Sequence, residues 1–248
     1  MSETAVSSGI DTSARALLGE QTTESLLRNV WFVYRRNVLR IALIFILPTF
    51  PLLILTVISP GFLLVFEVVV YVAWAALSIA ISDICLGTRP SVRRSYSQVL
   101  RRRVWIKLFT AAFLTALLTY LGLLLLIVGT FWVQVRLVFV PTVVALERRS
   151  GRAAIRRTWG LTDHQFWRLF KSLVLIFVAF LAVALPLIVV GVVVGRANSP
   201  TIGNILLYLG FLGVVAPAVG IAVVLLYYDE RVRRESYDAD ALSEDLMR

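Results

Sequence analysis

The feature that most constrains this chain is a series of long apolar runs, joined by short connections that alternate between arginine-rich and nearly uncharged. A helix needs roughly 20 apolar residues to cross a hydrocarbon core about 30 Å thick. Only 16% of the 248 residues are charged, against about a quarter in soluble domains. The sequence therefore predicts an all-α membrane protein with six transmembrane helices, at residues 38–58, 62–84, 107–127, 131–147, 171–195 and 204–228.

Positive charge gives these spans an orientation. Two connections, 89–107 and 148–171, each carry seven arginines or lysines, whereas the other three connections carry only Arg196 between them. Short loops rich in arginine and lysine stay on the cytoplasmic side of a membrane. We therefore expect both termini to be cytoplasmic. The predicted domain organisation is a disordered tail over 1–21, the six-span domain over 22–235 and an acidic tail over 236–248.

Three segments that precede the odd-numbered spans resemble one another, because each combines arginines with an aromatic residue. We expect each to form an amphipathic helix in the headgroup plane, before spans one, three and five. Two interpretations of the similarity stay open: a tandem threefold repeat of helix plus hairpin, or the rhythm of any hairpin protein with basic inner loops. The segments are 26–40 with Trp31, 92–107 with Tyr96 and 154–171 with Trp159.

Side chains suited to catalysis or metal binding are sparse. One cysteine, Cys85, and one histidine, His164, cannot supply a disulfide or a ligand cluster within the chain. No pair of acids at a defined spacing suggests acid–base chemistry. We therefore expect a protein that is not an enzyme, with no catalytic residues, no metal site and no cofactor.

Two charged residues, Glu67 and Arg136, fall inside predicted spans at similar depths counted from the outer turns. A charge near the middle of a membrane costs about 2.5 to 3.5 kcal/mol, so pairing is the simplest remedy. The pair is interpreted either as a structural salt bridge or as a polar site near Gln134 and Tyr71, unless Arg136 simply extends to the interface. The polar site gives the alternative function, a small-solute or ion transporter or channel.

Glycine and proline inside the spans have both packing and functional interpretations. Gly191 and Gly195 form a GxxxG pattern, which predicts close approach of another helix. Prolines occur in four spans, as in the broken helices of transporters, although membrane helices tolerate proline in general.

The arginine-rich connections are the strongest candidate for a binding surface. Arginine clusters beside a span attract anionic headgroups by about 1 kcal/mol per residue near the surface. Part of this charge serves orientation, but fourteen basic residues in two connections exceed that need. Nucleic acid is not an expected partner, because the charges lie against the bilayer and no separate domain carries them. The predicted lipid-binding or partner-binding residues, called the arginine collar, are Arg93, Arg94, Arg101, Arg102, Arg103, Arg152, Arg156 and Arg157.

Four strings resemble one bacterial family, that of the glycerophosphoryl diester phosphodiesterase membrane domain, over nearly all of residues 25–240. They are SLLRNVWFVYRRNVLRI, DICLGTRPSVRRSY, VRLVFVPTVVALERRSGRAAIRRTWGLTDHQFWRLF and LLYYDERVRRESYDAD. The family name comes from fusions to a soluble phosphodiesterase domain, for which this chain has no residues to spare. The resemblance implies a membrane module of uncharacterised activity, and it transfers no catalytic residue. Such proteins often read Pro-Gly where this chain has Val128-Gly129.

These observations predict a non-enzymatic, multi-pass module of the bacterial cytoplasmic (inner) membrane. We expect the arginine collar to bind anionic lipid headgroups or a membrane protein partner.

Overall fold

The computed structural model describes residues 17, 19–58, 63–124, 126–163, 165–197, 200–235 and 241–242, and every regular element in these ranges is helical. The all-α prediction is therefore confirmed for the described part of the chain. The elements are α2 (Thr23–Ile58), α3 (Leu63–Cys85), α4 (Val92–Val99), α5 (Arg102–Leu124), α6 (Leu126–Leu137), α7 (Val140–Leu146), α8 (Gly151–Thr162), α9 (Phe166–Ala197), α10 (Pro200–Gly210), the π-helix η2 (Phe211–Val215) and α11 (Ala216–Glu235).

Five helical segments in the described ranges are long and apolar enough to cross a membrane, which makes this a multi-pass membrane protein. They correspond to predicted spans two to six and cover Val68–Cys85, Arg103–Gly122, Gly129–Leu146, Phe166–Ala197 and Thr201–Glu235. The first predicted span, 38–58, lies in the second half of α2, and its side chains from residue 52 onward lie outside the described residues. The count of six, the orientation of the termini and the threefold repeat remain predictions. The predicted tails, 1–21 and 236–248, also fall mostly outside these ranges.

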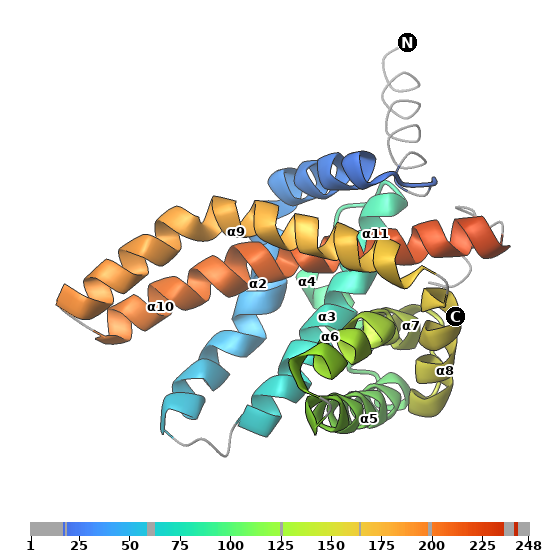
Figure 1. The fold of residues 1–248 in the computed structure, drawn as a ribbon, viewed down its shortest axis with the longest axis horizontal. Coiled ribbons are helices and arrows are strands. Elements are labelled where there is room, and N and C mark those ends of the chain that lie inside the picture. Colours follow the sequence, from blue (N-terminus) through green and yellow to red (C-terminus); the bar gives the residue numbers. More distant parts are fainter. Residues whose placement is uncertain are drawn as a thin grey trace, which may run out of the picture.

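Consecutive helices pack together as hairpins. Helix α2 pairs with α3, α5 with α6 and α9 with α10, and α11 returns to pack against α2, α3 and α9. In Figure 1 the α9–α10 pair and the α2–α3 pair extend in different directions from the region where α3, α7 and α11 meet. Short helical segments stand before these hairpins: the first half of α2, then α4 and α8.

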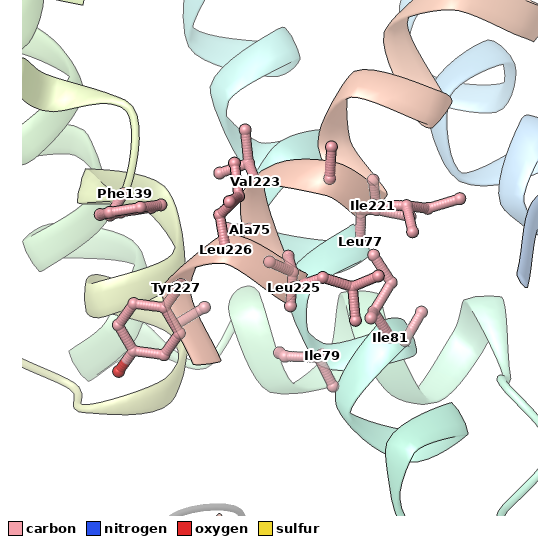
Figure 2. Close-up of a cluster of buried hydrophobic side chains, with 14 of the residues drawn as sticks. Ala75, Leu77, Ile79, Ile81, Phe139, Ile221, Val223, Leu225, Leu226 and Tyr227 are labelled. Atoms are coloured by element: carbon pink, nitrogen blue, oxygen red, sulfur yellow. The ribbon is translucent and has the colours of Figure 1, made fainter. Parts of the chain in front are cut away.

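The core lies where α3 crosses α11 (Figure 2). Leu77 and Ile81 of α3 pack with Ile221 and Leu225 of α11, and all four are fully buried. The outward faces of α5 and α9 are different, because large apolar side chains such as Phe113 remain exposed there. An exposed apolar face of this length is typical of contact with lipid.

The fourth predicted span differs from the structure. The turn expected at 128–130 lies inside α6, since α5 ends at Leu124 and α6 begins at Leu126. Gly129 serves close packing instead, because a Cβ on Gly122 of α5 would lie 3.1 Å from the Gly129 carbonyl oxygen. The predicted span 131–147 is also interrupted, with α6 ending at Leu137 and α7 starting at Val140. Pro141, in the first turn of α7, lacks the N–H that a continuous helix would need.

Two prolines leave a helix carbonyl without its normal donor four residues later, and a tyrosine from another segment supplies one. Pro217 has no N–H to donate to the carbonyl of Gly213, which lies in the π-helix η2, and the Tyr34 hydroxyl donates to that oxygen at 3.0 Å. Pro48 likewise has no N–H to donate to Ile44, whose carbonyl accepts from the Tyr96 hydroxyl. These two broken positions are therefore satisfied by the protein itself.

Replacing Tyr96 by phenylalanine is expected to destabilise the protein by about 1 to 3 kcal/mol, because the Ile44 carbonyl would lose its donor inside the fold. The thermal unfolding temperature of the purified protein in detergent measures this. Tyr120→Phe is the control, since Tyr120 is exposed on α5. Equal unfolding temperatures for the two variants would show that the Tyr96 hydroxyl contributes nothing.

Candidate functional site

The last turns of α11 carry adjacent carboxylates in the interior of the protein. Tyr227, Tyr228, Asp229 and Glu230 are each at most 1% exposed. The sequence places Asp229 where a span meets the basic connections, but it does not indicate this degree of burial. Two buried carboxylates side by side require positive partners, because an uncompensated buried charge costs several kcal/mol.

Arg168 of α9 is the partner that both carboxylates share. One terminal nitrogen, Nη1, donates to Asp229 Oδ2 at 2.6 Å, and Nη2 donates to Glu230 Oε1. On its other side Asp229 Oδ1 accepts from the Arg233 Nε at 2.9 Å and from the backbone N–H of Gln21 at 2.7 Å. The carboxylate of Asp229 therefore joins α9, α11 and the segment before α2.

Arg234 connects α11 to the end of α8. Its Nε lies 3.5 Å from Glu230 Oε2, one helical turn before it. Its two terminal nitrogens donate to the carbonyls of Gly160 at 2.8 Å and Asp163 at 2.6 Å. Since α8 ends at Thr162, these bonds satisfy carbonyls at a helix C-terminus, where positive charge is favourable.

A second set of ion pairs surrounds Glu147, at the end of α7. Its Oε1 accepts from the Arg157 Nε at 3.0 Å and from the Tyr227 hydroxyl at 2.9 Å, while Oε2 accepts from the Arg149 Nε at 2.6 Å. Arg157 also pairs with Glu235. Burial opposes the charge of Arg157, but its bonds to Glu235 and Glu147 outweigh that effect and raise its pKa above the ordinary value. Arg157 is a predicted member of the arginine collar, but in the structure it forms ion pairs with carboxylates of α11 and of the end of α7.

We call these two sets, which both include residues of α11, the α11 ion network. Its members are Glu147, Arg149, Arg157, Arg168, Asp229, Glu230, Arg231, Arg233, Arg234 and Glu235. Part of it has a signal in the sequence, because acid and arginine alternate at i,i+4 spacing in YYDERVRRE. Arg168 and Arg157 give no such signal, since they lie far from α11 along the chain.

Arg136 has a carboxylate partner outside its own span. Its Nη1 lies 3.1 Å from Asp163 Oδ1, in the connection between α8 and α9. The guanidinium carbon stands 5.3 Å and 5.6 Å from the ring centres of Trp132 and Trp159, an arrangement with cation–π character. Glu67 lies in α3, and its side chain is outside the described residues, so the predicted Glu67–Arg136 pair stays a prediction.

The two polar residues predicted near that pair do share a cavity. Tyr71 and Gln134 line a space of about 290 Å³ between α3, α5, α6 and α7, and Arg136 is not part of its lining. The hydroxyls of Tyr71 and Thr115 are 3.2 Å apart, and the Gln134 amide donates to Thr119 at 3.3 Å. The described polar groups of this cavity thus bond to neighbouring helices.

The remaining collar arginines differ in whether a carboxylate pairs with them. Arg94 lies 3.6 Å from the buried carboxylate of Asp83, and the side chain of Arg102 is outside the described residues. Five others are exposed and form no ion pair with any carboxylate that the structure describes. These five, called the free collar, are Arg93, Arg101, Arg103, Arg152 and Arg156.

The start of α8 packs closely on α5 and forms a hollow beside Arg152 of the free collar. A Cβ on Gly151 would lie 2.9 Å from the Ala111 backbone nitrogen, so only glycine fits this contact. The contact places Arg152 beside Thr110 in a hollow of about 400 Å³, lined also by Phe109, Phe113, Leu114, Ser150 and Gly151. Nearby, burial and the positive charge of Arg101 lower the pKa of Arg148.

Comparison with protein families gives one match. The family described as the membrane domain of glycerophosphoryl diester phosphodiesterase matches residues 90–229, which is more than half of the chain. The matched range starts just before α4 and ends at Asp229, so it includes Glu147 and Arg168. Neither the comparison with curated proteins nor that with solved structures gave a match.

Proposed function

Because this chain belongs to the family of the membrane domain of glycerophosphoryl diester phosphodiesterase, we propose that it is a non-enzymatic membrane module that binds anionic lipid headgroups. The binding groups are the free collar arginines on α4, α5 and α8, together with Arg102 from the same run of sequence. Arg157 is not one of these binding groups, because it already forms ion pairs with Glu147 and Glu235.

The observation that carries the proposal is the unequal distribution of carboxylates among the arginines. Asp229, Glu230, Glu147 and Glu235 all pair with arginines of the α11 ion network. Asp83 and Asp163 pair with Arg94 and Arg136. The free collar keeps its charge uncompensated by described acids, on the side that the charge distribution predicts to face the cytoplasm. Anionic lipids of the cytoplasmic leaflet attract basic residues at that surface.

The hollow beside Arg152 supports the same chemistry. Ser150 stands at the N-cap of α8 without a side-chain cap bond, and the first N–H groups of a helix favour an anion. Phe109 and Phe113 of α5 are exposed next to it. A guanidinium and a helix N-terminus beside apolar side chains suit a molecule with an anionic head and an acyl tail.

Substituting the free collar by glutamine is expected to reduce the anionic lipid that copurifies with the protein in mild detergent. Each arginine near the surface contributes about 1 kcal/mol of attraction, so five substitutions together remove most of the enrichment over the host membrane. Lipid extraction and mass spectrometry of the purified protein measure the ratio of anionic to zwitterionic lipid.

The control removes Arg196, an exposed arginine in the connection that is predicted to face outside. This variant should retain the enrichment. No enrichment in the unaltered protein, or an equal loss in both variants, contradicts lipid binding by the collar. A polypeptide that copurifies with the unaltered protein and is lost with the free collar would identify a membrane protein partner as the ligand instead.

The transporter or channel alternative rests on the cavity lined by Tyr71, Thr115 and Gln134. Two observations weigh against this alternative. The described polar side chains of the cavity already form hydrogen bonds to neighbouring helices, and at two prolines a tyrosine hydroxyl already donates to the backbone carbonyl four residues earlier. Solute uptake into proteoliposomes made with the same proteins distinguishes it, because transport would survive removal of the free collar.

A further inference from the structure

Three arginines outside the arginine collar meet in one cavity. A space of about 560 Å³ lies between the middle of α2 and the loop from α3 to α4, and Arg36, Arg40 and Arg89 line it. Arg36 and Arg40 come from either side of a kink in α2, and Arg89 comes from the loop.

Local backbone geometry explains why the three converge. Asn37 has a non-helical conformation, with φ −127° and ψ 21°, which bends α2 between Arg36 and Arg40. At the end of α3, Gly87 adopts φ 75°, a left-handed conformation that favours glycine. That turn ends the helix and carries Thr88, Arg89 and Pro90 to the kink, where they border the cavity.

The cavity is positive, since three of the described residues that line it are arginines and none of them is acidic. The carboxylate of Asp83, one turn before Gly87, is buried and lies 3.6 Å from Arg94 instead. Arg36 contacts the Phe32 ring, with 5.7 Å between the guanidinium carbon and the ring centre. Among the described residues none forms an ion pair with Arg36, Arg40 or Arg89. Three guanidinium groups around one cavity repel one another unless an anion lies between them.

The rest of the lining is apolar. Phe32, Val38 and Leu39 border the cavity and are exposed, Leu39 to 76%. Leu39 stands at the start of the first predicted span, where acyl chains are expected to begin. Guanidinium groups at one end and exposed apolar side chains at the other fit an amphiphile with a negatively charged head.

We propose that this cavity binds the phosphate of an anionic lipid, with Arg36, Arg40 and Arg89 as its ligands. Guanidinium groups bind phosphate oxygens through paired N–H donors, which a single lysine cannot do. Leu39 and Phe32 contact the first carbons of the acyl chains. The site differs from the free collar, because it is a cavity for one lipid and not an extended surface.

Native mass spectrometry of the full chain, titrated with phosphatidylglycerol, tests this site. The unaltered protein is expected to show one saturable lipid adduct, and Arg36→Gln/Arg40→Gln/Arg89→Gln to bind that lipid roughly tenfold or more weakly. Titration with phosphatidylcholine, which has no net charge, should give no saturable adduct. Equal binding of phosphatidylglycerol by the triple variant and the unaltered protein would overturn the proposal.

Matched variants separate this site from the collar. Arg28→Gln/Arg35→Gln removes exposed charges from α2 beside the cavity and should leave the adduct unchanged, as should substitution of the free collar. Loss of the adduct only on collar substitution would overturn the cavity site while leaving the proposed function standing. Inorganic phosphate at equal concentration should not displace the lipid, and displacement would assign the cavity to soluble phosphate. If the triple variant fails to fold, Arg89→Gln alone replaces it, because Arg89 lies in the exposed loop; this variant should also bind phosphatidylglycerol more weakly than the unaltered protein.

Discussion

Arg168→Ala is expected to lower the free energy of unfolding by about 3 to 5 kcal/mol, enough to remove much of the folded protein. The guanidinium of Arg168 donates to both Asp229 and Glu230, which are 0% and 1% exposed. Among the described residues, its removal leaves the two buried carboxylates with only the arginines of their own helix, Arg233 and Arg234, as ion-pair partners. The cost comes mainly from stranding these charges, because the lost pair itself offsets its own desolvation.

Two further variants test that cause. Arg168→Ala combined with Asp229→Asn and Glu230→Gln should recover part of the stability, because neutral amides are less costly to bury than unpaired carboxylates. Lys171→Ala, three residues later on the exposed face of α9, is the control and should change little. Yield of monodisperse protein and unfolding temperature in detergent are the measurements. A single variant as stable as Lys171→Ala would show that the network has no stabilising role.

Features of the fold that depend on local pattern could be predicted from the sequence. The apolar runs give helices wherever the structure describes them, and Trp31, Tyr96 and Trp159 do lie in helices that precede hairpins. The GxxxG at Gly191 and Gly195 predicts close packing, and the structure supplies the partner, α10. Each of these needs only the spacing of residues along one segment.

Features that depend on where distant segments meet could not be predicted from the sequence. The predicted depth of Arg136 depends on a turn at 128–130, whereas α5 ends at Leu124 and α6 begins at Leu126, and the partner Asp163 comes from another connection. The contacts of Arg168 with Asp229 and Glu230 join segments about 60 residues apart. The free collar could be predicted as a surface, because exposed charge beside a span needs no partner. The ion pairs of Arg157 with Glu147 and Glu235 join separate segments and leave no local pattern in the sequence.

Gly203→Ala is expected to destabilise the α9–α10 hairpin, because a Cβ at this position has no room. It would lie 2.4 Å from the Gly195 Cα, 2.6 Å from the Gly191 carbonyl oxygen and 2.8 Å from the Gly195 nitrogen. All three atoms are backbone, so a rotamer change cannot relieve the overlap and the helices must separate. Overpacking of this kind typically costs about 1 to 3 kcal/mol, and more where no side chain can yield.

Gly160→Ala isolates the clash from the effect of helix propensity. Gly160 is in a helix and a Cβ there would meet nothing within 4 Å, so the substitution should be neutral or should stabilise by up to about 1 kcal/mol. The same propensity gain applies to Gly203→Ala, which means that any net loss at Gly203 understates the clash. Unfolding temperatures in one detergent compare the two variants directly. If Gly203→Ala unfolds at the same temperature as Gly160→Ala, then α9 and α10 do not approach through their glycines, and the hairpin must be held by its larger apolar side chains.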